Sequence, residues 1–249
     1  MLSISSLTPL QWTALAVASV LLGMQKTGVQ GVILFAVPVL ATIFGGRVSV
    51  GLVLPMYSIA DMFALYYYHR DADWKHVFRV LPATVVGITI AALVGASISD
   101  EAFRRIIAIC VLASLAILAW REFIRRDMDI PRWWWFPPVI GLAGGFATMI
   151  GNASASIMAL YLLSMQLPKK NYIGTSAWFY FFNNLIKIPF HVFLWGTITG
   201  STLAINALMV PLILVGAMIG VRVVRLIPEK PYRIFVIAVT LLASVLLFF

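Results

Sequence analysis

The sequence predicts an all-α polytopic membrane protein made of two inverted-topology repeats. Three observations predict it: the apolar composition, a series of separated apolar segments, and a second half that repeats features of the first. Of the 249 residues, 62% are hydrophobic and 11% are charged, and the mean hydropathy is +0.99. A soluble domain carries about 25% charged residues. Lipid must therefore surround most of these apolar side chains.

The apolar segments predict five elements in each half of the chain. The first repeat (1–127) contains a broken helical hairpin at 8–44, followed by transmembrane helices at 48–68, 80–97 and 103–120. The second repeat (128–249) contains a broken hairpin at 134–166, followed by transmembrane helices at 172–195, 201–221 and 232–249. A full span needs about 20 residues. The arms of both hairpins are shorter than that, whereas the other six segments are long enough to cross a bilayer.

The internal repeat is visible as matched residues at a constant offset. An offset of 123 aligns Gly28 with Gly151, Tyr57 with Tyr180 and Asp61 with Asn184, and an offset of 129 aligns Pro82 with Pro211 and Gly87 with Gly216. Five segments is an odd number, so the second half must enter the membrane from the opposite side. Inverted repeats of this kind are typical of secondary transporters.

The basic residues predict the orientation of the chain. With the predicted spans, thirteen Lys and Arg residues fall on one side: Arg70, Lys75, Arg79, Arg121, Arg125, Arg126, Arg132, Lys169, Lys170, Arg222, Arg225, Lys230 and Arg233. The other side holds Arg47, Arg104 and Arg105. Cytoplasmic loops carry the excess of basic residues. Both termini are therefore expected on the non-cytoplasmic side.

The two hairpin tips, GMQKTG and MIGNASAS, predict a binding site. Short, interrupted segments at corresponding places in two halves are the best sequence pointer to the site of a transporter. A helix that begins just after a tip directs free N–H groups and a positive dipole end at the site, which favours an anion. The substrate-binding residues predicted at the tips are Gln25, Lys26, Thr27, Gly28, Gly151, Asn152 and Ser154. If the first pair of segments instead forms two full spans, Lys26 lies in an ordinary surface loop.

Further polar residues lie inside predicted spans. A charged side chain at the middle of a membrane helix costs about 2.5–3.5 kcal/mol on insertion scales, so it should face a cavity or a partner. Asn183, Asn184 and Lys187 fall on one side of a helix, and we predict them to bind the anion as well. Asp61 is the candidate for coupling transport to protons. Alternatively it forms a structural pair with Lys187 or Lys26. Pro55 and Pro189 are candidates for breaks in these helices.

Several functional classes are disfavoured by the same residues. No G-x4-G-K-[ST] motif for nucleotide binding is present in the sequence. The three histidines have no metal-ligand spacing, so no metal or cofactor is expected. Cys110 is the single cysteine and forms no intrachain disulfide. The net charge of +9 fits cytoplasmic loops better than a nucleic-acid surface. We expect no enzyme activity and no nucleic-acid partner.

Two long strings resemble the signature regions of the sulfite exporter TauE/SafE family. They are GMQKTGVQGVILFAVPVLATIFGGRVSVGLVLPMYSIAD and GNASASIMALYLLSMQLPKKNYIGTSAWFYFFNNLIKIP. The P-x4-G elements at Pro82–Gly87 and Pro211–Gly216 extend the resemblance over essentially the whole chain. The resemblance implies transport of sulfur-containing anions, such as sulfite, thiosulfate or sulfoacetate, across a bacterial inner membrane.

Together these observations predict a secondary transporter that works by alternating access between the two repeats. Its partners would be a small sulfur-containing anion and the lipid bilayer. Export is the expected direction, with an uptake permease or a channel for a related anion as the alternative. The sequence leaves the oligomeric state open, a homo-oligomer included.

Overall fold

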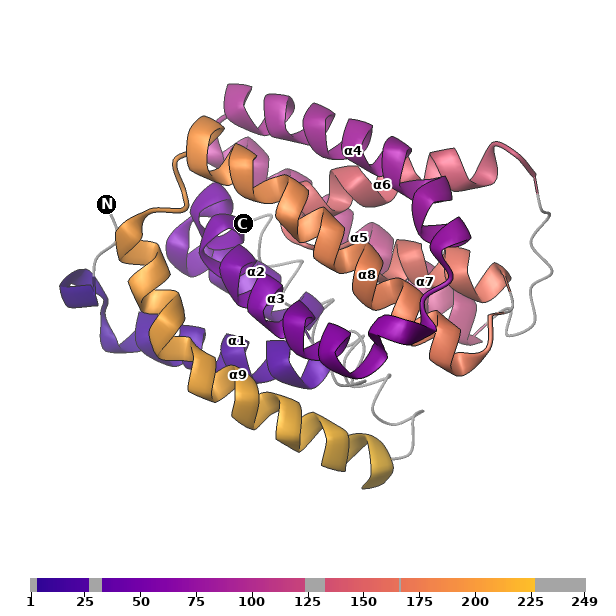
Figure 1. Cartoon of the computed structure of the whole chain (residues 1–249). Helices are drawn as coiled ribbons and strands as arrows, with labels where there is room; N and C mark the ends of the chain where they lie inside the picture. The colour runs from indigo at the N-terminus through magenta and orange to yellow at the C-terminus, as the bar shows by residue number, and fades with distance from the viewer. Residues whose placement is uncertain (1–3, 27–32, 124–132, 166, 227–249) are drawn as a thin grey trace.

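The computed structural model describes residues 4–26, 33–123, 133–165 and 167–226, and this part of the chain is all-helical (Figure 1). Its α-helices are α1 (Pro9–Lys26), α2 (Ile33–Phe44), α3 (Gly46–Tyr68), α4 (Trp74–Ser97), α5 (Asp100–Phe123), α6 (Phe136–Gly151), α7 (Ala155–Ser164), α8 (Lys169–Pro189) and α9 (Gly200–Leu226). 3₁₀ turns occur at Ile4–Ser6 and His69–Asp71, and a π-helical turn occurs at Phe190–Leu194. The predicted helical class is confirmed.

Three of the described helices are long and apolar enough to cross a membrane: Gly46–Tyr66, Trp74–Ser97 and Gly200–Gly220. They correspond to the predicted spans at 48–68, 80–97 and 201–221. Helices α5 and α8 occupy two further predicted spans, but α5 begins with four charged residues within six positions and α8 carries three asparagines and three lysines. The predicted span at 232–249 lies outside the described residues.

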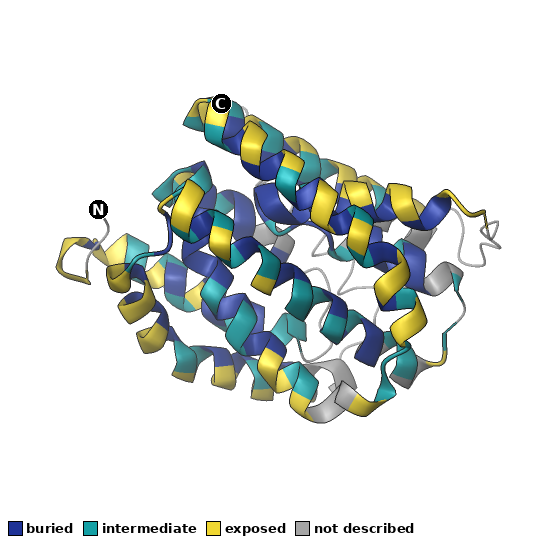
Figure 2. Ribbon diagram, turned by 45° about the horizontal axis from the view of Figure 1, so that its top comes forward, coloured by how far each residue is buried: buried dark blue, intermediate teal, exposed yellow. Residues whose placement is uncertain are grey.

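The helices form two paired edges around a central pair. Helix α4 packs along α6 at one edge, α1 packs along α9 at the opposite edge, and α3 packs against α8 between them (Figure 1). The outer faces of the peripheral helices are exposed, whereas buried residues lie on the inward faces (Figure 2). On α4 and α9 the exposed residues include large apolar side chains, among them Val86, Leu93, Leu208 and Met218. Such surfaces match a lipid environment.

Glycines allow close approach of the backbones where the edge helices cross. A Cβ atom added at any of four glycines would lie within 2.2 Å of a carbonyl oxygen of the partner helix, far inside van der Waals contact. The contacts are Gly216 with Val20 and Gly23 with Ile213 between α1 and α9, and Gly87 with Leu142 and Gly145 with Thr84 between α4 and α6. Small residues are typical of helix interfaces in membranes.

The two prolines expected to break helices behave differently. Pro55 lies inside α3 and does not end it, so the predicted break at Pro55 is wrong. Membrane helices tolerate an internal proline when neighbouring groups compensate the freed carbonyl. At Pro189 the α-helical pattern does end, and the chain continues as the π-helical turn Phe190–Leu194.

Candidate functional site

A small cavity lies where the described parts of both predicted tips meet α3 and α8. Its lining comes from five helices or their ends: Gln25, Lys26, Tyr57, Thr148, Asn152, Ser154, Ala155, Tyr180 and Asn184. The cavity measures about 30 Å³, which is room for about two water molecules. Helix α7 begins at Ala155, so its first N–H groups, which have no partner within the helix, lie at the edge of the cavity.

Lys26 and Asp61 form a buried ion pair beside this cavity. Lys26 ends α1 and its side chain is 12% exposed, whereas the side chain of Asp61 is fully buried in α3. Lys26 Nζ donates a hydrogen bond to Asp61 Oδ1, and the Asn184 side-chain amide donates a 2.5 Å bond to Asp61 Oδ2. Both carboxylate oxygens of Asp61 therefore have a donor, one from each half of the chain.

Two tyrosine rings flank the ammonium group of Lys26. Nζ lies 5.4 Å from the ring centroid of Tyr57 and 4.9 Å from that of Tyr180. A cation within about 6 Å of an aromatic ring centroid is attracted by the ring quadrupole. The Tyr57 hydroxyl and Gln25 Oε1 are buried and have no hydrogen-bond partner in the described part of the chain. Both residues line the cavity, so these atoms are available to a ligand or to water.

Lys187 is the second buried cation, and its contacts are different from those of Lys26. Its side chain is fully buried in α8. Nζ lies 2.6 Å from Asn152 Oδ1, 3.1 Å from Thr148 Oγ1 and 3.3 Å from the Thr148 carbonyl oxygen. These are three oxygen acceptors for the three N–H groups of an ammonium group. None of them is a carboxylate, so these contacts satisfy its hydrogen bonds without neutralising its charge.

The break between α6 and α7 is held in place by its backbone conformation and by α5. Asn152 has a φ of 53° and caps α6 in the left-handed region, where its backbone N–H bonds the Thr148 carbonyl at 3.0 Å. Asparagine tolerates this conformation better than most residues. Ser114 Oγ of α5 donates a 2.6 Å hydrogen bond to the Ala153 carbonyl. This turn aims the Asn152 side chain at Lys187.

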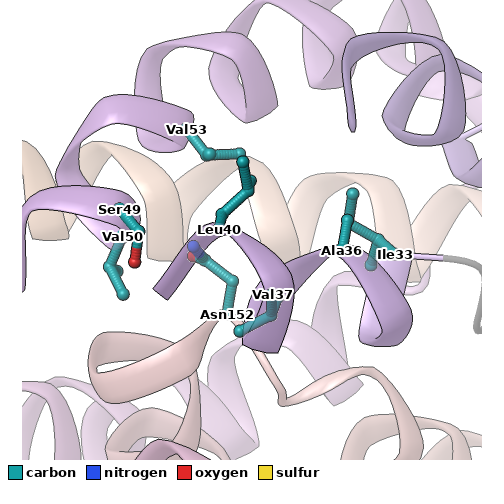
Figure 3. Close-up of a pocket in the computed structure, with 8 residues that line it drawn as sticks. All are labelled: Ile33, Ala36, Val37, Leu40, Ser49, Val50, Val53 and Asn152. Carbon is teal, nitrogen blue, oxygen red and sulfur yellow. The ribbon is translucent and has the colours of Figure 1, made fainter. Parts of the chain in front are cut away.

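Asn152 also lines a second cavity (Figure 3). It measures about 10 Å³ and is lined by Ile33, Ala36, Val37, Leu40, Ser49, Val50, Val53 and Asn152, which come mainly from α2 and α3. Asn152 is the residue shared by the linings of the two cavities. It therefore stands between an apolar space and the charged cavity.

The structure brings together most of the residues predicted for the site. Gln25, Lys26, Asn152, Ser154 and Asn184 line the charged cavity, and Asp61 and Lys187 contact lining residues directly. Of the two pairs considered for Asp61, the one with Lys26 forms the direct contact.

Among the described residues predicted for the site, Gly151 and Asn183 do not line the charged cavity. Gly151 is buried and faces Ile107 and Val37 at ordinary contact distance. Asn183 is fully buried, and its amide has no hydrogen-bond partner within the described ranges. Thr27 and Gly28 lie outside the described residues.

Sequence reasoning did not assign Tyr57 and Tyr180 to the site. The sequence did contain a signal for them. The offset of 123 aligns Tyr57 with Tyr180, and these tyrosines lie close in sequence to Asp61 and Asn184, which the same offset aligns. The role of Thr148 as an acceptor for Lys187 depends on the packing of α6 against α8.

The apolar helices and the buried charged cavity define a multi-pass membrane protein with a polar internal site. The chain belongs to the sulfite exporter TauE/SafE family, whose model matches residues 14–247, nearly the whole chain. This confirms the resemblance found in the sequence. The family is one of membrane transporters, and its name indicates sulfur-containing anions as substrates. Searches of curated proteins and of solved structures each gave no match.

Proposed function

We propose that this protein is a secondary transporter, in the export direction, of a small sulfur-containing anion such as sulfite or an organosulfonate. The observation that carries the proposal is the cavity with the part-buried Lys26 in its lining and with the buried Lys187 and Asp61 bonded to lining residues. Charged groups inside a membrane protein mark substrate or ion pathways. The Tyr57 hydroxyl, which has no hydrogen-bond partner among the described residues, adds a donor for an anion at the same place.

The residues proposed to bind the anion are those of the predicted tips together with Asn183, Asn184 and Lys187. Lys26 and Lys187 supply charge, the Asn152 side chain accepts a hydrogen bond from Lys187, and the Asn184 side chain donates one to Asp61. The start of α7 adds a positive dipole end at the edge of the cavity. Since the cavity has room for about two water molecules, an oxyanion must widen it on binding.

Alternating access between two inverted repeats is the proposed mechanism. It is supported by the glycine contacts at the two edges. Gly87 and Gly216 differ by 129 positions, and the carbonyls they face, those of Leu142 and Val20, differ by 122. Each crossing thus pairs the first helix of one half with the fourth element of the other. Such paired crossings suit two halves that move against each other around a central site.

Counterflow in proteoliposomes tests the proposal. Vesicles loaded with unlabelled sulfite and diluted into labelled sulfite should accumulate label transiently, because a carrier exchanges its substrate across the membrane. Lys26→Ala should abolish the transient, whereas the control Lys75→Ala should keep it, since Lys75 is exposed at the start of α4. Sulfite flux without counterflow would favour a channel. Absence of flux for every sulfur anion tested in both directions would overturn the proposal.

A further inference from the structure

The buried charges of the site do not balance. Among the described residues, Lys26 and Lys187 in their ionised forms carry two positive charges and ionised Asp61 carries one negative charge, so the three groups then sum to +1. Within the described part of the chain, Lys26 and Lys187 are the charged groups near Asp61, and Tyr57 and Tyr180 are titratable side chains close to it. A net buried charge is costly in a low-dielectric interior. The site is therefore short of one negative charge.

The Asp61 carboxylate lies where its protonation state can adjust the net charge of the site. Its two oxygens are bound by Lys26 and Asn184, so it acts on the site as an internal anion. A bound anion must share Lys26 with this carboxylate. If the anion brings one negative charge, the cluster becomes neutral. If the anion brings two, one proton on Asp61 restores neutrality.

We propose that Asp61 sets the charge of the transported species: the site takes a monovalent anion alone, or a divalent anion together with one proton bound by Asp61. This rests on the proposed function and specifies its substrate class. Asp61 is thereby a specificity-determining residue, and the proton-coupling role considered for it applies to divalent substrates. The proton binds to one of the two carboxylate oxygens of Asp61, which accept hydrogen bonds from Lys26 and Asn184.

The repeat supplies a matched set of variants. Asn184 is the counterpart of Asp61 under the offset of 123 and is its direct hydrogen-bond partner at 2.5 Å. Asp61→Asn raises the charge of the cluster by one with almost no change in shape. Asn184→Asp lowers it by one. The double variant Asp61→Asn/Asn184→Asp returns the charge to the native value but moves the carboxylate from α3 to α8.

The test compares two probes of different charge, methanesulfonate with one charge and thiosulfate with two. Affinities are measured by calorimetry on the purified full chain in a buffer without sulfonate groups, and proton uptake is followed with a pH electrode in a weakly buffered sample. For the wild type, thiosulfate binding should take up about one proton per anion and methanesulfonate binding about none. Asp61→Asn should abolish the uptake and shift the preference toward thiosulfate by at least about tenfold.

The double variant should restore the native preference and the proton uptake, a rescue that a purely structural role of Asp61 would not produce. An unchanged preference in Asp61→Asn, or proton uptake that persists in this variant, would overturn the proposal. If Asp61→Asn fails to fold, the proposal is tested by the number of protons that the wild type takes up per thiosulfate and by the anion preference of the double variant. Failure of the proposed function looks different: neither probe binds the wild type, or Lys26→Ala and Lys187→Ala both bind as the wild type does.

Discussion

Replacing the edge glycines by alanine tests the packing that surrounds the site. At Gly216 an added Cβ would lie 2.1 Å from the Val20 carbonyl oxygen, and at Gly87 it would lie 2.2 Å from the Leu142 carbonyl oxygen. A non-bonded carbon–oxygen contact is about 3.3 Å or more, so each pair of helices must separate by about 1 Å. Overpacking of this kind costs about 1–3 kcal/mol. We expect Gly216→Ala and Gly87→Ala to be destabilised by similar amounts.

Gly144→Ala is the matched control within α6. The nearest atom to its added Cβ is 3.7 Å away, which is ordinary contact. Alanine in a helix is favoured over glycine by about 0.5–1 kcal/mol, so this variant should be as stable as the wild type or more so. The assay is thermal unfolding in detergent with a thiol-reactive dye, because the half-buried Cys110 is the single thiol of the chain. Native unfolding midpoints in both edge variants would refute the packing argument.

Two further substitutions test the site itself. Lys26→Met leaves the fully buried Asp61 without its cation and should lower the free energy of unfolding by about 3 kcal/mol or more. Adding Asp61→Leu to this variant should recover most of the lost stability. Equal unfolding midpoints for the single and double variants would contradict the pairing of Lys26 with Asp61. Asn152→Gly suits the φ of 53° but removes an acceptor from Lys187, so calorimetry should find weaker anion binding in a protein of near-native stability. Asn152→Ala should be less stable than Asn152→Gly by about 1 kcal/mol, and the reverse order would be inconsistent with the left-handed cap.

The helical class and most helix boundaries followed from the sequence. Apolar composition excludes a soluble fold, and the polar interruptions near Lys26 and Asn152 coincide with the end of α1 and with the break between α6 and α7. The prediction at Pro55 failed because a single proline removes one hydrogen bond, and packing in α3 tolerates the loss. Repeat symmetry, orientation and the number of spans remain predictions.

The site was predictable in its residue types but not in its pairing. Asp61, Lys26 and Lys187 stood out because charges are rare within apolar segments. Which lysine contacts Asp61 depends on how α1 and α8 are placed around α3, and no pattern in the sequence carries that information. The same holds for the Tyr57 and Tyr180 rings, since an aromatic residue in an apolar span has many packing partners. Long-range geometry, rather than composition, decided these contacts.

The central claim is that Lys26 and Lys187 form an anion site, and a stability titration tests it most directly. A ligand that binds the folded state stabilises it by about 2.7 kcal/mol at a concentration of one hundred times its Kd. The unfolding midpoint of the wild type and of Lys75→Ala should rise with sulfite, thiosulfate or sulfoacetate, and not with acetate or chloride. Lys26→Ala and Lys187→Ala should lose this rise. A rise of native size in both lysine variants would contradict the account.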